Sequence, residues 1–179
     1  MLEIQTKSLN FNQRMENQKD IKIGFAPIFD QNSRVLILGS FPSVKSREID
    51  FYYGNKQNRF WKMLCGYFKE EIPQTTDGKK EFLKRRNVAL WDMIISCEIE
   101  GSSDASVKNA EVANLDVVLR QAPIEKILLN GALAYDLFVE YYADRTIPYR
   151  KMPSTSPANP RYDESVWTKE LDNVFTNIK

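Results

Sequence analysis

The chain has 179 residues, of which 42% are hydrophobic and 12% aromatic, so it is long enough for one well-packed core and too short for two ordinary domains. Its formal net charge is +1, and the charged residues of both signs make up 27% of it, so the total charge does not require a polyanionic partner. With two cysteines and no histidine, the sequence excludes the usual zinc and iron–sulfur ligand sets and every catalytic scheme that uses histidine. We therefore expect neither a metal nor a cofactor.

The N-terminal segment is polar and lacks a sustained period, so we predict a loosely held lead-in over residues 1–22 and a single domain over 23–179. No apolar run approaches the roughly 20 residues that a membrane span requires, and the chain does not open with the pattern of a signal peptide. These features predict a cytoplasmic protein with free thiols and no membrane contact. Nothing in the sequence requires more than a monomer.

Beyond the lead-in, short β-rich runs alternate with longer helical patterns, which is typical of an α/β layer architecture. The apolar run 34–39 is expected to be a buried central strand, with further strands over 88–94 and 124–129 and a fourth that ends at Met152. We predict an α/β fold, a three-layer αβα sandwich with a central, mostly parallel four-stranded sheet. The predicted helices comprise 58–68, a segment that ends in the basic cluster at 79–86, the region 112–119, a helix that ends at Tyr142 and a final helix capped by Asp163.

Ligands of open α/β sheets bind beyond the carboxyl ends of the strands, so the loops that follow the predicted strands form the candidate site. These loops cover residues 39–43, 96–106, 130–131 and 153–160. The last of them holds three prolines among small hydroxylated residues, a composition that specifies an irregular, semi-rigid segment. A single turn such as 39–43 is weak evidence of function, and the combination of loops is more informative.

The segment 51–58 carries aromatic and amide side chains but no Asp, Glu or His that could act as a strong base. A site for a flat heterocycle needs aromatic faces for stacking and amides for recognition of the ring edge, and this segment offers both. By residue type alone, simpler roles are favoured: Tyr52 and Tyr53 pack, and Asn58 is the N-cap of the next helix. The residues themselves leave both interpretations open.

Several motifs follow one another in order from about Gly24 to the C-terminus. The first motif region of the mismatch-specific uracil and thymine glycosylases is similar to Gly39-Ser-Phe-Pro-Ser43, Phe51-Tyr-Tyr53 and Asn58-Arg-Phe-Trp61, and their second motif to Pro153-Ser-Thr-Ser-Pro-Ala-Asn159. The hypoxanthine-DNA (deoxyinosine) glycosylases are similar at Trp91-Asp92, Ser96-Cys-Glu98 and Gly101-Ser-Ser-Asp-Ala-Ser106. The chain thus resembles the uracil-DNA glycosylase superfamily, and its hypoxanthine branch in particular.

The resemblance implies a DNA repair enzyme that flips a deaminated base, hypoxanthine or also uracil, out of double-stranded DNA and hydrolyses its N-glycosidic bond without cutting the strand. Mismatch-specific relatives have their catalytic Asn where this chain has Phe41, whereas in the hypoxanthine branch the catalytic Asn resembles Asn58. That branch carries a His-Pro pair in place of Asn55-Lys56, so the loop shape and the choice among hypoxanthine, uracil and xanthine stay open. The iron–sulfur branches of the superfamily require four cysteines, which this chain does not have, so these branches are excluded.

The resemblance also assigns roles to the candidate residues. Asn58 would orient water toward C1′ of the oxocarbenium-like sugar, because a neutral amide avoids the desolvation cost of a buried carboxylate. Tyr53 aligns with the aromatic residue on which relatives stack the base, and backbone N–H groups of 41–43 would bind a carbonyl of the base. The expected base pocket comprises Gly39, Ser40, Phe41, Pro42, Ser43, Tyr53, Asp104 and Ser106. The expected DNA contacts are a minor-groove loop of Pro153, Ser154, Thr155, Ser156, Pro157, Ala158 and Asn159, and phosphate contacts from Arg150, Lys151 and Arg161.

Two other interpretations remain. Without an Asn in the first motif, the protein could be a catalytically silent member that binds damaged or single-stranded DNA. It could also be a nucleoside hydrolase or a nucleotide-binding module on the same kind of sheet, and neither of these would need the loop 153–160. Retained DNA binding without product would identify the first, and a harmless deletion of the loop would identify the second.

Overall fold

Four parallel strands lie at the centre of the computed structural model, which describes residues 20–176. Their spatial order is β3-β2-β6-β7, and in their register Leu38 of β2 is aligned with Trp91 of β3 and Leu129 of β6. The predicted α/β class is confirmed, and the four-stranded sheet is entirely rather than mostly parallel. The strands are β2 (Val35–Gly39), β3 (Val88–Asp92), β6 (Lys126–Asn130) and β7 (Tyr149–Met152).

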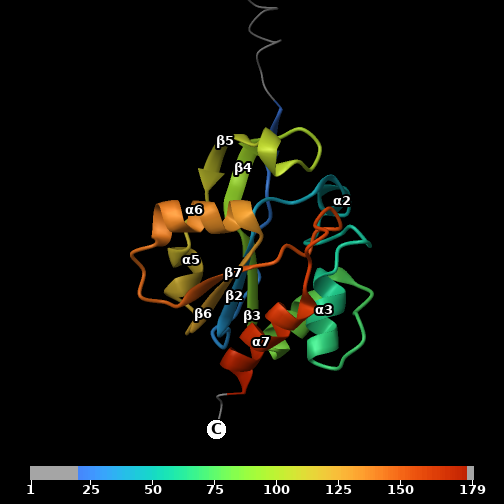
Figure 1. The fold of residues 1–179 in the computed structure, drawn as a ribbon, viewed down its shortest axis with the longest axis vertical. Coiled ribbons are helices and arrows are strands. Elements are labelled where there is room, and N and C mark those ends of the chain that lie inside the picture. Colours follow the sequence, from blue (N-terminus) through green and yellow to red (C-terminus); the bar gives the residue numbers. More distant parts are fainter. Residues whose placement is uncertain (1–19, 177–179) are drawn as a thin grey trace, which may run out of the picture.

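Helices cover both faces of this sheet, which explains why every residue of β2 and β3 is buried (Figure 1). On one side lie α5 (Asp116–Leu119) and α6 (Ala132–Tyr142), and on the other side lie α3 (Phe60–Tyr67), α4 (Thr76–Arg85) and α7 (Glu164–Phe175). The helices predicted over 58–68 and after Asp163 are present as α3 and α7, and each of them buries an apolar face. Their fully buried side chains are Phe60, Met63 and Leu64 in α3, and Trp167 and Leu171 in α7.

The sequence predicted the N-cap residues of two helices, one correctly and one incorrectly. The predicted cap of the last helix is confirmed, because Asp163 Oδ1 accepts a hydrogen bond of 2.9 Å from the N–H of Ser165. The predicted N-cap at Asn58 is wrong by one residue, since Arg59 occupies that position before α3. Asn58 still satisfies one orphan donor of the helix, because its Oδ1 accepts from the N–H of Phe60 at 3.0 Å.

A second, antiparallel sheet of order β1-β4-β5 was not expected from the sequence. The predicted strand 88–94 is in fact two, because the chain leaves the parallel sheet at Asp92 and continues in the small sheet after Met93. Met93 forms the junction, since its N–H donates to Gly39 and its carbonyl accepts from Ala113. The strands of this sheet are β1 (Ile21–Ile23), β4 (Ile94–Glu98) and β5 (Lys108–Val112).

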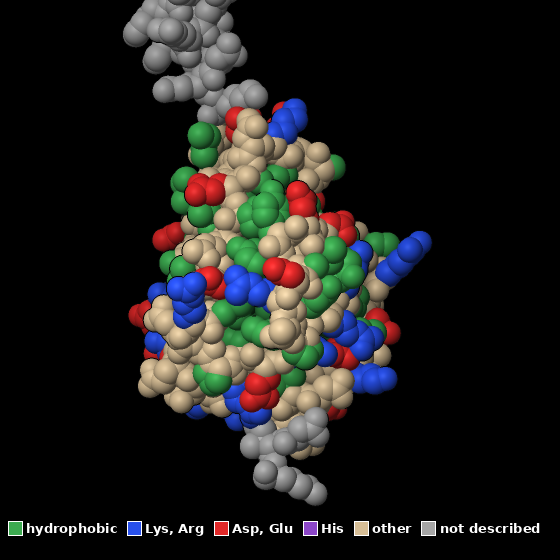
Figure 2. Space-filling view, turned by 90° about the vertical axis from the view of Figure 1, so that its left-hand side faces the viewer, with side chains coloured by type: hydrophobic (Ala, Val, Ile, Leu, Met, Phe, Trp, Pro, Cys, Tyr) green, Lys and Arg blue, Asp and Glu red, His purple; other side chains and the backbone are tan. Residues whose placement is uncertain are grey.

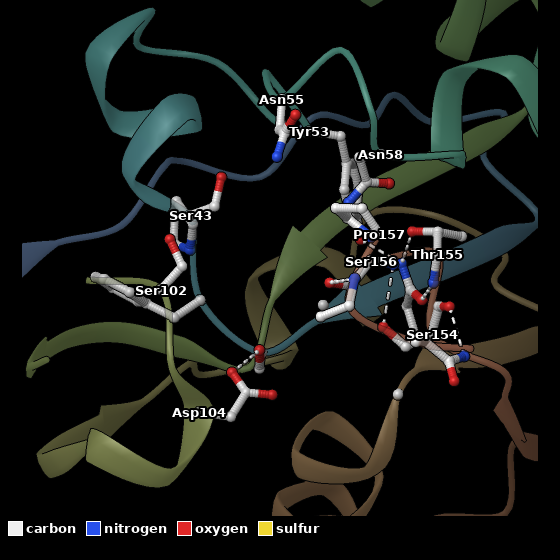
Figure 3. A pocket seen from close by; sticks show the side chains of 18 of the residues that line it. Ser43, Tyr53, Asn55, Asn58, Ser102, Asp104, Ser154, Thr155, Ser156 and Pro157 are labelled. Carbon is white, nitrogen blue, oxygen red and sulfur yellow. Dashed lines mark hydrogen bonds between the residues drawn. The ribbon is translucent and has the colours of Figure 1, made fainter. Parts of the chain in front are cut away.

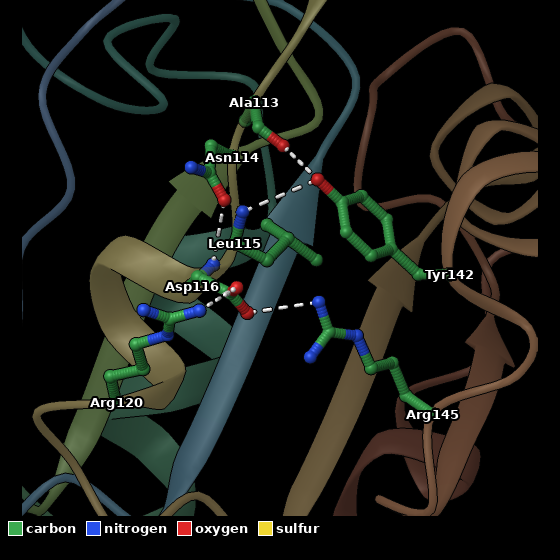
Figure 4. Close-up of polar contacts among 7 residues, drawn as sticks. All are labelled: Ala113, Asn114, Leu115, Asp116, Arg120, Tyr142 and Arg145. Carbon is green, nitrogen blue, oxygen red and sulfur yellow. Dashed lines mark hydrogen bonds and ion pairs between the residues drawn. The ribbon is translucent and has the colours of Figure 1, made fainter.

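The helix predicted over 112–119 is also shorter than expected, because Val112 pairs with Ile94 in the small sheet and α5 begins only at Asp116. Polar contacts hold this junction together (Figure 4). Tyr142, the last residue of α6, donates to the carbonyl of Ala113 at 2.6 Å. The carboxylate of Asp116 forms ion pairs with Arg120 and Arg145, which ties α5 to the end of α6. These long-range contacts, rather than local periodicity, decide where the helix begins.

Most of the predicted lead-in lies outside the described residues, and its last two residues, Ile21 and Lys22, belong to β1. The remaining short elements, α2 (Val44–Glu48) and the 3₁₀ turn η1 (Asp104–Ser106), lie in loops. Over residues 20–176, none of the helices combines the length and the apolar character needed to cross a bilayer. Figure 2 shows basic and acidic side chains interspersed on the face of the molecule that carries α5 and α6.

Candidate active site

A cavity of about 950 Å³ opens at the carboxyl ends of the parallel strands (Figure 3). The last residue of each of the four strands lines it: Gly39, Asp92, Asn130 and Met152. This is the edge of the sheet where the site was predicted, because the loops that leave parallel strands converge there. Segments between residues 39 and 161 meet around the cavity, so its wall combines residues up to about 120 positions apart in sequence.

Most of the predicted site residues line this cavity. Two do not, Ser106 and Arg150. Lining residues from the prediction comprise Gly39, Ser40, Phe41, Pro42, Ser43, Tyr53, Asn58, Asp104, Lys151, Pro153, Ser154, Thr155, Ser156, Pro157, Ala158, Asn159 and Arg161.

Ser106 stabilises the loop behind the cavity wall instead of forming the wall. Its hydroxyl donates to the carbonyl of Ser103 at 2.7 Å and accepts from the N–H of Glu100 at 3.0 Å. Both bonds close the turn that contains η1, which carries Asp104 to the cavity. Ser106 is therefore a scaffold residue for Asp104 rather than a pocket residue.

Arg150 is engaged on the helical side of the sheet. Its guanidinium forms an ion pair with Glu170 of α7, whose side chain is only 2% exposed. Lys126 approaches the same carboxylate at 3.2 Å. Two cations thus neutralise one buried acid, which is the usual requirement for a charge in a protein interior. This pairing gives Arg150 a structural role and does not favour the phosphate contact predicted for it.

The turn 39–43 is held against the loop 101–106 by side chains from both. Ser40 Oγ donates to Asp104 Oδ1 at 3.0 Å, and Ser102 Oγ accepts from the N–H of Val44 at 2.8 Å. Arg47 donates to the carbonyls of Pro42 and Gly101, at 2.8 and 3.0 Å. The loop 101–106 therefore closes one side of the cavity.

Backbone donors remain available in this turn. Within residues 20–176, the N–H groups of Phe41 and Ser43 donate to no other group. Pro42, between them, has no N–H, so the three-residue donor set expected from the sequence is reduced to two. Two N–H groups separated by one residue can still approach a single oxygen atom.

Tyr53 reaches the cavity from the loop between α2 and α3. Its ring stacks on Phe60 with 4.0 Å between centroids, and its hydroxyl accepts from Asn130 Nδ2 at 2.9 Å. The backbone of Tyr53 has φ of +52°, a left-handed conformation that costs a non-glycine residue of order 1 kcal/mol or more. Burial raises the pKa of its phenol, so the group stays neutral. A strained residue fixed at both ends is typical of a functional site.

Asn58 is fixed by the turn that precedes it. Its N–H donates to the carbonyl of Asn55 at 2.8 Å, and Asn55 Oδ1 accepts from the N–H of Gln57 at 2.9 Å. Asn55 therefore stabilises a compact turn. The hypoxanthine branch, which the chain resembles, has a His-Pro pair at this position. In Figure 3, Asn58 lies beside Tyr53 and faces the loop that contains Ser156 and Pro157.

The loop 153–160 is irregular, as predicted, and Arg59 ties it to the side of the cavity that holds Asn58. The guanidinium of Arg59 donates to the carbonyl of Ser156 at 2.9 Å and to that of Asn159 at 3.3 Å. Its backbone N–H donates to the carbonyl of Thr155 at 3.0 Å. Because Arg59 follows Asn58 directly, the loop and the predicted catalytic residue share one anchor.

Asn130 provides a second anchor for the same loop. Its Oδ1 accepts from the N–H of Thr155 at 3.0 Å, and its Nδ2 donates to Thr155 Oγ1 at 3.0 Å as well as to Tyr53. Sequence reasoning assigned no role to Asn130 or Arg59 individually. Both lie in segments that it had singled out, so their position in those motifs was the available signal.

Two carboxyl groups line the cavity and influence each other electrostatically. Asp92 is 4% exposed, and burial together with the nearby charge of Asp104 raises its pKa to about 7. Burial also raises the pKa of Asp104, although the hydrogen bond from Ser40 opposes this shift. Asp92 was noted only as part of a motif and was missed as a site residue. In the part of the chain from 20 to 176, no group of three or more His, Cys, Asp and Glu side chains is placed to hold a metal ion.

Comparison with known proteins decides the family. A model of the uracil DNA glycosylase superfamily matches residues 26–174. The chain belongs to this superfamily. A solution NMR structure of a candidate uracil DNA glycosylase from Methanosarcina acetivorans is similar with a TM-score of 0.73 and 30% identity, and the match covers 87% of this chain and 99% of that one. The predicted family and the predicted layer architecture are both confirmed.

Two curated relatives carry the name hypoxanthine DNA glycosylase. The protein of Methanosarcina barkeri is 34% identical over 112 residues, which cover 62% of this chain and 71% of the relative. The protein of Methanosarcina acetivorans is 32% identical over 154 residues, which cover 82% of this chain and 96% of the relative. Together with the superfamily match, these relatives confirm the predicted class of activity, a DNA glycosylase that acts in repair.

Proposed function

We propose that this glycosylase removes hypoxanthine, and also uracil, from double-stranded DNA, and leaves an abasic site. The observation that carries the proposal is that one cavity gathers Asn58, Tyr53, the donors of the turn 39–43 and the loop 153–160. The names of the two curated relatives support hypoxanthine as the base. The cavity, at about 950 Å³, has room for a flipped base with its sugar.

Recognition of the base would use Tyr53 and the turn that begins the cavity. An aromatic ring whose orientation is fixed by Phe60 and Asn130 offers a rigid stacking surface for a planar base. The unengaged N–H groups of Phe41 and Ser43 would donate to a carbonyl oxygen of the base. Such donors stabilise the negative charge that the base acquires as the bond to the sugar breaks.

Hydrolysis would depend on Asn58. The sugar left by the departing base is strongly electrophilic, so the attacking water needs orientation more than deprotonation. Asn58 Oδ1 already accepts one hydrogen bond, from Phe60, and a carbonyl oxygen has a second lone pair with which it can hold a water molecule. None of the lysines falls in a recognised motif for attack on the sugar, so we expect base removal without strand cleavage.

Contact with the duplex would come from the loop 153–160 and two cations beside it. The anchored loop would enter the minor groove and occupy the space left by the flipped nucleotide, at little entropic cost because it is already ordered. Lys151 and Arg161 line the cavity and would contact phosphates of the strand that is bound. The monomeric state and the cytoplasmic location stay predictions.

The test is excision from labelled duplexes that contain one deoxyinosine or one deoxyuridine, followed by alkaline cleavage of abasic sites. Wild type should release hypoxanthine, and Asn58→Ala should lose at least 100-fold in rate. Asn32→Ala, an exposed turn residue at the opposite ends of the strands, is the matched control and should keep the wild-type rate. Thermal melting of each variant separates lost chemistry from lost folding, because Asn58 Oδ1 also accepts a hydrogen bond from the first residue of α3.

Two outcomes would replace the proposal. DNA binding without product from the wild-type protein would favour the catalytically silent, damage-binding interpretation that Phe41 in the first motif raises. Release of base from free nucleosides by a variant that lacks the loop 153–160 would instead favour a nucleoside hydrolase.

A further inference from the structure

Asp92 is a buried acid that the mechanism above does not use. It ends β3 on the floor of the cavity, 4% exposed, between the turn 39–43 and the loop that carries Asp104. A side chain at position 39 would place its Cβ 2.3 Å from Asp92 Oδ1, so the glycine there leaves room for the carboxyl group. The backbone around Asp92 is therefore arranged to accommodate a carboxylic acid at the centre of the site.

This carboxyl group lacks the partners that a buried acid normally has. Among residues 20–176, no group donates a hydrogen bond to Asp92 Oδ2, whereas Asp104 accepts one from Ser40. A buried polar atom without a partner costs about 1–3 kcal/mol, and evolution tolerates such a cost mainly where a ligand or the chemistry requires it. Oδ2 itself is closed to solvent, but the residue lines the cavity, so a bound base can approach this carboxyl group there.

Burial and one nearby charge disfavour the ionised form of Asp92. The charge is that of Asp104, and the phenols of Tyr52 and Tyr53 also lie near Asp92, but burial raises their pKa values and keeps them neutral. No cation is among them. Burial and one like charge hold the pKa of Asp92 at about 7, where an acid can give up its proton near neutral pH. Below pH 7 the carboxyl group is thus mainly protonated, and it can act there as a proton donor.

We propose that Asp92 is the general acid of the reaction and protonates the departing purine on the edge that carries N7 and O6. This inference rests on the proposed function and adds a proton donor to it. As the bond from C1′ to N9 breaks, its electron pair moves into the purine, and the proton of Asp92 goes to that purine, which leaves as the neutral base. Water adds to C1′ and releases one proton to solvent, and Asp92 regains a proton from solvent, so the net reaction is hydrolysis.

Separate roles toward the sugar and toward the base explain why the site holds both an amide and an acid. Asn58 lines the cavity beside Tyr53 and would serve the sugar, whereas Asp92 lies at the end of β3 and would serve the base. Activation of the leaving group by proton transfer contributes about 10²–10⁴-fold in rate when the donor is well placed. A neutral donor also avoids repulsion from the electron-rich oxygen of the base.

The experiment measures single-turnover excision of hypoxanthine from a deoxyinosine duplex between pH 5.5 and 9, with saturating enzyme. The wild-type rate should fall tenfold per pH unit above about 7. Asp92→Asn, which keeps the shape but has no acidic proton, should be at least 100-fold slower at pH 6, and its rate should not depend on pH. Binding of a duplex with the uncleavable 2′-fluoro analogue of deoxyinosine, measured in parallel, should change less than threefold.

Asp104→Asn supplies an independent test that leaves Asp92 intact. Removing the like charge should move the descending limb of the profile to lower pH, and it keeps the proposal testable if Asp92→Asn does not fold. Three results would each overturn the role of Asp92. The first is an Asp92→Asn rate within threefold of wild type, and the second is an Asp92→Asn rate that still falls with pH as in wild type. The third is an Asp104→Asn rate that begins to fall at the same pH as in wild type. Equal losses of binding and rate would make Asp92 a base-holding group and not an acid. Absence of excision by wild type would instead overturn the proposed function.

Discussion

Asn130 Nδ2 donates a hydrogen bond of 2.9 Å to the hydroxyl of Tyr53, across 77 residues of sequence. The same amide holds Thr155 through both its N–H and its hydroxyl. One buried side chain at the end of β6 therefore sets the position of the Tyr53 ring and of the loop 153–160. In this arrangement Asn130 orients two functional parts of the site at once.

Asn130→Ala should lower both stability and activity. The change leaves the buried N–H and hydroxyl of Thr155 without partners, at a cost of about 2–4 kcal/mol. We expect excision to fall roughly 10–100-fold, because Tyr53 and the loop lose their common support. Asn130→Asp is the matched variant, since it keeps the acceptor for the N–H of Thr155 and loses only the two donated bonds. Denaturant unfolding and single-turnover kinetics measure the two effects, and an Asn130→Asp protein that behaves like wild type would contradict the roles of the donated bonds.

Arg59→Lys should impair DNA binding without changing the charge. A lysine cannot donate to the carbonyls of Ser156 and Asn159 in the geometry of a guanidinium, so the loop 153–160 loses one anchor. We expect the Kd for the lesion duplex to rise about tenfold, because binding must then order the loop. Arg85→Lys, on the exposed surface of α4, is the control. A Kd for Arg59→Lys that matches this control would show that the backbone bond to Thr155 suffices.

The cations near the cavity should differ in their salt response. Removing a phosphate contact reduces the slope of log affinity against log salt concentration by about 0.9, and we expect this for Lys151→Ala and for Arg161→Ala. Arg150→Ala should leave the slope unchanged and should instead lower stability by about 1–3 kcal/mol, since Glu170 loses a partner. Titration of a labelled duplex at several salt concentrations tests this. A reduced slope for Arg150→Ala would restore it as a phosphate contact.

Asp92 should make the protein less stable as the pH rises. Its pKa is about 7 in the folded state and 3.8 in the ordinary state, so between these values the folded protein binds more protons than the unfolded chain. The free energy of unfolding must then fall with increasing pH over this window, by about 4 kcal/mol at most. Asp92→Asn should remove this dependence and be the more stable protein at pH 8. Unfolding by denaturant at pH 4.5, 6 and 8 provides the measurement, and a parallel decline in both proteins would refute it.

Local patterns were sufficient to locate the parallel strands, because an uninterrupted apolar run such as 35–38 can be buried only at the centre of an α/β sheet. They failed at Met93 and Val112, where the chain changes sheets. Nothing local distinguishes β4 from an extension of β3, and β5 is exposed over most of its length, so its sequence carries no alternating apolar signal. These elements exist because of pairing between distant segments.

The sequence by itself determined the layer architecture, the family and the loops that form the site, since these depend on hydrophobic periodicity and on motifs in a fixed order. Only the tertiary structure decided which residues of those loops face the cavity. It turned Ser106 and Arg150 away, and it brought Arg59, Asn130 and Asp92 into contact with the site. The physical reason is that the burial of a polar side chain and its hydrogen-bond partners depend on segments far away in the chain. A local sequence pattern does not contain this information.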